Sequence, residues 1–276
     1  MTRTAIVVTH GGRPEALVAL REAMHELTAA GFTVVLHDQD IPTPHGDLMG
    51  VQRPETADAE IVVVLGGDGT ILRAAVHRVA ARDYEVEERG VVEVEVRAPG
   101  HERPVIGWAL NEATVEKADR QRMLEVAIEV DGRPLSSFGC DGVVISTATG
   151  STAHAFSAGG PVVWPDVDAM LLVPLAAHAL FARPLVVGPR STFAVEIVTR
   201  SQSGGVLTLD GRRRIDVAPG ARIEVRRGSD PVRLARLSHA PFTDRLVRKF
   251  SLPVVGWRGG APRTGSQPVI PHHPKD

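Results

Sequence analysis

Cysteine and lysine are scarce in this sequence. A single cysteine, Cys140, occurs in 276 residues, which excludes a disulfide framework and any site in which several thiolates hold a metal. The only lysines are Lys117, Lys249 and Lys275, and none of them completes a G-x-x-x-x-G-K-[ST] pattern. A P-loop is therefore excluded. A protein with this sequence would need a different motif to bind phosphate groups.

The sequence also lacks a surplus of either charge and any long apolar run. The 31 Lys+Arg residues against 33 Asp+Glu give a formal net charge of −2, whereas a protein held to nucleic acid by phosphate contacts carries a basic surplus. The most apolar stretch, residues 169–182, is interrupted by Pro174 and His178 and is shorter than the roughly 20 residues of a membrane-spanning helix. The apolar stretch at the N-terminus is too short for a signal peptide. We expect a cytoplasmic protein that binds neither nucleic acid nor a membrane.

Strand and helix patterns alternate over the first eighty residues. Apolar runs at 5–8, 32–36 and 61–65 predict strands, and the last run, rich in β-branched residues, predicts a strand covered on both faces of a parallel sheet. Helices are predicted from Pro14, a good first-turn residue, and over 71–81. This order predicts a parallel α/β domain with right-handed crossovers.

The pattern changes after this region. Val92, Val94 and Val96 alternate with charged residues, which indicates a half-exposed strand, and further short strands follow as far as Val225. Many short strands at close spacing are typical of a β-sandwich. The tail from Gly259 is rich in glycine, proline and histidine and is predicted to be disordered.

A glycine-rich turn, Gly66–Thr70 (GGDGT), joins the third predicted strand to the next helix. The N–H groups and the positive dipole end at a helix N-terminus favour an anion, and three glycines let the main chain approach a phosphate closely. Asp68 in their midst would repel that phosphate unless it binds a metal or accepts a proton. A tight turn in which Asp68 only caps the helix explains the pentapeptide equally well, so this motif alone leaves both interpretations open.

Small hydroxyl residues form a second candidate site. Five serines and threonines surround Gly150 between residues 146 and 152, and the stretch Ser157–Pro161 (SAGGP) follows at once. Such a run supplies hydroxyl and backbone donors to a polar ligand without bulk, and a plain capping loop would not need this density of small residues. The pair Asn111–Glu112 can grip a ribose diol or an adenine edge, although such a pair is common on protein surfaces.

Taken together, these motifs in this order resemble the NAD kinase family from about residue 3 to residue 258. The resemblance rests on Gly66–Thr70, Asn111–Glu112, Asp141-Gly142, residues 146–153, Ser157–Pro161, Pro174, His178 and Arg183-Pro184. It implies a kinase that phosphorylates the 2′-hydroxyl of the adenosine ribose of NAD, giving NADP, with ATP or polyphosphate as donor. A lipid kinase of the diacylglycerol type resembles the chain only at the first motif and is the poorer alternative.

The resemblance also implies roles for individual residues. Asp68 would be the general base that accepts the 2′-hydroxyl proton. The implied phosphate-binding residues are Gly66, Gly67, Gly69 and Thr70. The implied NAD-binding residues are Asp68, Gly69, Arg73, Asn111, Glu112, Arg122, Asp141, Thr152, Ala153, His154 (where the family usually has a tyrosine) and Ser157. Mg²⁺ would arrive with the phosphates of the donor, and no metal site of the protein itself is expected. A homo-oligomer, dimer or tetramer, is also implied.

The chain departs from the family pattern after its second predicted helix. There the family has a further strand, a Gly-Asn-x-Gly-type loop and a helix, whereas this sequence runs directly from Ala80–Asp83 to Tyr84. We therefore expect a truncated Rossmann-like α/β domain followed by a β-sandwich-like domain. The expected divisions are 1–83, 84–241, a segment 242–258 that returns to the first domain, and a disordered tail over 259–276. A catalytically impaired NAD- or NADP-binding relative is the alternative that this gap leaves open.

Overall fold

The chain divides into two units, each made of two stretches of sequence. The computed structural model describes residues 3–9, 14–36, 59–65, 72–179, 182–201, 203–237 and 240–254. The first unit comprises residues 1–93 and 227–238, and the second comprises residues 94–226 and 239–276. No helix in the described residues has both the length and the hydropathy needed to cross a bilayer.

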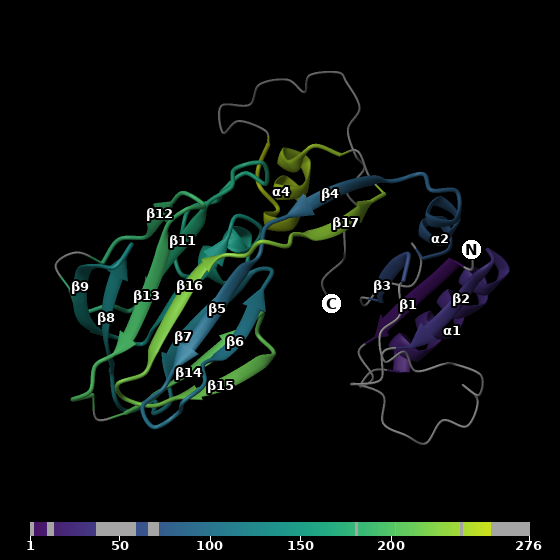
Figure 1. The fold of residues 1–276 in the computed structure, drawn as a ribbon. Coiled ribbons are helices and arrows are strands. Elements are labelled where there is room, and N and C mark those ends of the chain that lie inside the picture. The colour runs from purple at the N-terminus through teal and green to yellow at the C-terminus, as the bar shows by residue number, and fades with distance from the viewer. Residues whose placement is uncertain are drawn as a thin grey trace. The chain divides into compact units, whose positions relative to one another are not determined.

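A three-stranded parallel sheet lies at the centre of the first unit (Figure 1). Its strands, in spatial order, are β2 (Phe32–Leu36), β1 (Arg3–Thr9) and β3 (Ile61–Leu65). Helix α1 (Pro14–Ala29) contacts all three strands and also packs on α2 (Leu72–Ala80). The parallel α/β arrangement predicted for this part of the chain is confirmed.

Strand β3 is less buried than its sequence predicts. Val62 is 54% exposed and Val64 is 73% exposed, whereas the alternate side chains of Ile61–Leu65 pack into the core that contains Leu20 and Val76. The prediction that both faces of this strand are covered is wrong. The described helices α1 and α2 share one core on one face of the sheet, and β3 is an edge strand among the described strands.

A two-stranded antiparallel ribbon completes the first unit, formed by β4 (Glu85–Arg89) and β17 (Val232–Arg236). Its side chains form ion pairs across the strands: Arg233 Nε lies 3.1 Å from Glu88 Oε1, and Arg236 Nε lies 3.4 Å from Glu87 Oε2. This pairing brings β17, near the end of the described chain, next to β4, which precedes residue 90. The units consequently divide after Glu93, whereas the sequence suggested a boundary at residue 83.

Two six-stranded sheets form the β-sandwich expected from the short, closely spaced strands (Figure 1). The first sheet contains, in spatial order, β12 (Leu185–Val187), β11 (Met170–Leu175), β10 (Gly142–Thr147), β7 (Glu112–Lys117), β14 (Gly205–Leu209) and β15 (Arg213–Val217). The second contains β6 (Val105–Ala109), β5 (Val92–Arg97), β16 (Arg222–Arg227), β13 (Thr192–Ile197), β8 (Leu124–Val130) and β9 (Arg133–Cys140). Side chains of the two sheets meet in the core, where Leu124 and Ile197 lie against Gly205 of the opposite sheet.

Residues 148–169 cover the outer face of the first sheet. They include the 3-10 helix η2 (Thr149–Thr152) and the short helix α3 (His154–Ser157). Ala155 packs on Val144 of β10 and Val173 of β11. Strand β10 is therefore buried along its whole length, and the segment that follows it is held close above the sheet.

Helix α4 (Phe242–Phe250) belongs to the second unit. The Phe242 ring meets the Trp164 ring edge-on with centroids 4.9 Å apart, and the Phe250 ring lies 4.2 Å from the Phe156 ring. These aromatic contacts bind the described part of the segment 242–258 to the β-sandwich unit, and its expected return to the first domain stays a prediction. Residues 259–276 lie outside the described residues.

Candidate functional site

The candidate site lies where β7 begins and β10 ends. Glu112 of β7 pairs with Ser146 of β10 in the antiparallel register, and the chain then turns into η2 and α3. The backbone N–H of His154 donates a hydrogen bond to the Glu112 carboxylate. The structure thus brings Asn111–Glu112 together with the Thr152–His154 segment, as the NAD-binding assignment requires.

Glu112 is the most unusual side chain of this site. It is only 8% exposed, and its Oε2 atom has no hydrogen-bond partner among the described residues. Burial raises the pKa of Glu112, and the nearby Asp210 raises it further, while His154 and Lys249 lower it. A buried carboxylate oxygen without a partner is costly, and Oε2 keeps an acceptor position that no described residue fills.

The hydroxyl-rich stretch after β10 serves the fold more than the sequence suggested. Thr147 Oγ1 donates to the carbonyl of Leu110 at 2.6 Å, and Ser151 Oγ donates to the carbonyl of Ala148 at 2.7 Å. Both residues are buried. The interpretation of the whole run as ligand donors is corrected accordingly, because only its partly exposed members, such as Thr152, can reach a ligand.

Gly150 lets η2 lie directly on the start of β7. A Cβ atom at this position would come within 2.1 Å of the Asn111 carbonyl oxygen and 2.6 Å of Ser146 Oγ. That approach is far inside van der Waals contact, so only glycine fits. The same Asn111 carbonyl accepts a hydrogen bond from the Thr147 backbone N–H at 2.9 Å, which fixes the turn above the site.

Asp210 is a residue of this site that the sequence did not indicate. Its carboxylate accepts hydrogen bonds from the backbone N–H groups of Leu110 at 3.0 Å and Asn111 at 2.7 Å. It lies in the hairpin loop between β14 and β15, where Asp210 and Gly211 both have positive φ, as is common for Asp-Gly in hairpins. The dipeptide signals a turn in the sequence, but nothing local indicates that it reaches a strand 99 residues earlier.

Replacing Asp210 with alanine is expected to lower the melting temperature by several degrees. The change leaves two part-buried N–H groups without their acceptor, and an unsatisfied buried group costs about 1–3 kcal/mol. Thermal denaturation measures the effect. The control is Asp216→Ala on β15, an exposed residue of the same hairpin, which should melt as the wild type does. Equal melting temperatures for the two variants would contradict this role of Asp210.

Asp141 and Arg122 lie at the opposite end of the same strands. Lys117 Nζ at the end of β7 is 2.5 Å from Asp141 Oδ1, and Arg122 Nε is 3.5 Å from Asp119 Oδ2 in the following turn. Strand β7 separates this end from Glu112 by roughly 16 Å, at about 3.3 Å per residue. The structure therefore does not bring Asp141 and Arg122 to the Glu112 end within one chain, and their contact with NAD stays a prediction.

Other predicted site residues are described only in part. Residues 66–70, including Asp68, lie outside the described residues, and so does the side chain of Arg73 in the first turn of α2. Ala153 is partly buried and Ser157 is exposed beside the site. The described residues contain no group of three or more His, Cys, Asp or Glu side chains that could hold a metal ion.

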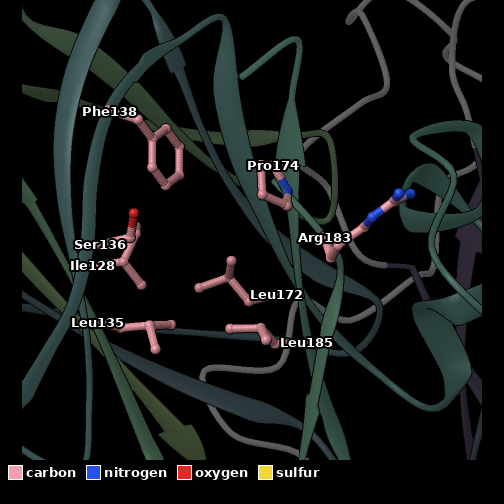
Figure 2. Close-up of a pocket in the computed structure, with 8 residues that line it drawn as sticks. All are labelled: Ile128, Leu135, Ser136, Phe138, Leu172, Pro174, Arg183 and Leu185. Carbon is pink, nitrogen blue, oxygen red and sulfur yellow. The ribbon is translucent and has the colours of Figure 1, made fainter. Parts of the chain in front are cut away.

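A separate small pocket opens between the two sheets at their β9 and β12 edges (Figure 2). It is lined by Ile128, Leu135, Ser136, Phe138, Leu172, Pro174, Arg183 and Leu185. Figure 2 shows the Arg183 guanidinium pointing away from the apolar side chains. The lining holds neither a carboxylate nor a histidine, so this cavity has no group for proton transfer.

Comparison with known proteins assigns the chain to a family. Residues 110–237 match the ATP-NAD kinase C-terminal domain. The NAD kinase of Leifsonia xyli subsp. xyli is 52% identical over 297 residues, which cover 93% of this chain and 97% of that protein. NAD kinase 2 of Streptomyces coelicolor is 49% identical over 294 residues, with the same coverage of each chain.

A solved structure shows the same fold. Yeast NADH kinase complexed with NADH matches 96% of this chain and 90% of its own, with a TM-score of 0.76 and 16% identity. The alignment with the Leifsonia protein runs over 297 positions yet covers only 93% of these 276 residues, so that relative carries residues that this chain lacks. With about half of its residues identical over nearly its whole length, this chain belongs to the NAD kinase family.

Proposed function

We propose that this protein phosphorylates NAD to NADP. The single observation that carries the proposal is the 52% identity to an NAD kinase over 93% of the chain. Glu112 supports it, because its Oε2 keeps an acceptor position that no described residue fills and that a ribose hydroxyl would fill. A lipid kinase is the poorer alternative, because its resemblance to the chain is confined to the Gly66–Thr70 motif.

Phosphoryl transfer depends more on positioning and charge neutralisation than on covalent chemistry. In the proposed reaction the 2′-hydroxyl oxygen attacks the terminal phosphorus of ATP or polyphosphate, its proton passes to Asp68, and the shortened donor leaves. Gly66, Gly67, Gly69 and Thr70 would hold phosphate oxygens through their backbone N–H groups. Arg73 would balance phosphate charge, and Mg²⁺ would enter bound to the donor.

The dinucleotide is assigned to the described site and its surroundings. Asn111 and Glu112 would bind ribose or adenine edges, and Thr152, Ala153, His154 and Ser157 would form the wall on the adenine side. Assembly into a homo-oligomer and a cytoplasmic location stay predictions made from the sequence.

An assay of NADP formation with ATP and with polyphosphate as alternative donors tests the proposal. NADP should accumulate only when NAD, a donor and Mg²⁺ are all present. If the protein binds NAD but forms no NADP with either donor, the catalytically impaired alternative is the correct one. The residues missing relative to the Leifsonia protein are the observation that favours that alternative.

NAD is expected to raise the melting temperature by several degrees, and diacylglycerol or sphingosine is not. A ligand at one hundred times its dissociation constant stabilises the folded state by about 2.7 kcal/mol, which is several degrees for a chain of this size. Differential scanning fluorimetry with each compound measures the shift. A shift with a lipid and none with NAD or NADP would overturn the assignment of substrate.

A further inference from the structure

Each lysine that the structure describes lies against a residue already assigned to the nucleotide. The chain has only three lysines, and two of them fall within the described residues. Lys117 contacts Asp141, and Lys249 Nζ lies 3.2 Å from Thr152 Oγ1. Lys249 comes from helix α4, more than ninety residues after Thr152, so the fold and not the local sequence brings it to the site.

Aromatic contacts fix the helix that carries Lys249. Phe250, the next residue, packs against Phe156 of α3 with the two rings tilted, and Phe242 at the start of the helix contacts Trp164 edge-on. Both partners belong to the segment that covers the outer face of the first sheet. Helix α4 is therefore bound to the same segment that contributes Thr152 and His154.

The ammonium group of Lys249 interacts with two side chains of the site, Thr152 and Glu112. As a pure donor it occupies a lone pair of Thr152 Oγ1, which leaves the hydroxyl hydrogen of Thr152 free to donate elsewhere. It also attracts the carboxylate of Glu112 and lowers the pKa of that group, against the burial and the Asp210 charge that raise it. Lys249 is exposed, so its remaining donors can reach a ligand.

We propose that Lys249 is a positioning residue of the NAD site, acting through Thr152 and Glu112. It orients the Thr152 hydroxyl toward the nucleotide and favours the ionised form of the Glu112 carboxylate, which accepts a hydrogen bond from the ribose. The proposal rests on the proposed function, because the nucleotide concerned is the NAD that the enzyme phosphorylates.

Three variants test it. Lys249→Met removes the charge and keeps the length of the side chain, Lys249→Arg keeps the charge, and Arg248→Met removes an adjacent exposed charge on the same helix. The KM for NAD of Lys249→Met should rise roughly tenfold, the factor of one charge-assisted hydrogen bond, with kcat changed less than twofold. Lys249→Arg should restore most of the affinity, and Arg248→Met should match the wild type.

The pH dependence of kcat/KM for NAD would not change if Lys249 only stabilised the fold. Glu112 is faced by His154 from α3, Asp210 from the β14–β15 loop and Lys249 from α4. Loss of the ammonium removes an influence that lowers the Glu112 pKa, so Glu112 should take up its proton at a higher pH. The acidic limb of kcat/KM for NAD should therefore move to higher pH in Lys249→Met and stay in place in Arg248→Met.

The last test measures whether Lys249 and Thr152 affect the KM for NAD independently of each other. In a double-mutant cycle, Thr152→Val and Lys249→Met together should raise the KM less than the product of the two single effects. Equal KM values and equal acidic limbs for Lys249→Met and Arg248→Met, in an enzyme that forms NADP, would overturn the proposal. If the wild type forms no NADP, the proposed function fails instead, and the same comparisons are then made on the NAD dissociation constant and its pH dependence.

Discussion

Asp68→Asn is expected to lower kcat for NADP formation by about 10²- to 10⁴-fold, the usual contribution of a general base. Asp68 is the only carboxylate in the sequence Gly66–Thr70. Asparagine keeps the size of the side chain but cannot accept the 2′-hydroxyl proton. Because binding does not need that proton transfer, the affinity for NAD should stay within severalfold of the wild type.

Steady-state kinetics with NAD and ATP, together with calorimetric titration of NAD, separates the two effects. Asp216→Asn, at an exposed position of β15, is the matched control and should leave kcat unchanged. An Asp68→Asn enzyme with near-normal kcat would show that another group accepts the proton. A loss of NAD affinity as large as the loss of kcat would assign Asp68 to binding instead.

Insertion of a family-type strand, loop and helix between Ala81 and Arg82 should raise both stability and turnover. Val62 and Val64 of β3 are more than half exposed, and covering them with a helix and a neighbouring strand should add about 2 kcal/mol or more of hydrophobic stabilisation. The inserted loop would also support the substrate near Asp68, where small misplacement can cost about 10²-fold in rate. The insertion point lies in an exposed turn, and exposed turns tolerate added chain.

A flexible Gly-Ser insertion of equal length is the control. It adds chain without covering β3, so it should raise neither the melting temperature nor kcat/KM. The same gain from both insertions, or NADP formation at a rate that the family-type insertion does not change, would show that the absent unit is dispensable to this enzyme.

The architecture could be read from the sequence because its signals are local. Alternating strand and helix patterns predicted the parallel sheet, and the close spacing of short strands predicted the sandwich. Burial of β3 could not be read in the same way. A run of β-branched residues reports the preference of a strand for cover, and whether a covering element exists depends on the rest of the chain. The aromatic partners of α4, Phe156 and Trp164, could not be predicted for the same reason, because they lie far from this helix in the sequence.

Part of the candidate site could also be predicted from the sequence, because two of its segments are local motifs. Asn111–Glu112 and the stretch after β10 were recognised as motifs, and the antiparallel register brings them together. Asp210 and Lys249 were missed because each reaches the site from far along the chain, through a hairpin loop and a helix. The buried hydroxyls of Thr147 and Ser151 were overvalued, because a sequence does not show which hydroxyls the backbone already occupies.

The ribbon of β4 and β17 bears on how this protein is made. Arg233 pairs with Glu88, which lies 145 residues earlier in the chain. At about 5–20 residues per second, a ribosome needs roughly 7 to 30 s between these two residues. During that time β4 has emerged without its partner strand, Glu88 lacks Arg233, and the ribbon forms only after the strands of the sandwich have been synthesised. A nascent chain halted before residue 232 should therefore present β4 as an open edge to chaperones.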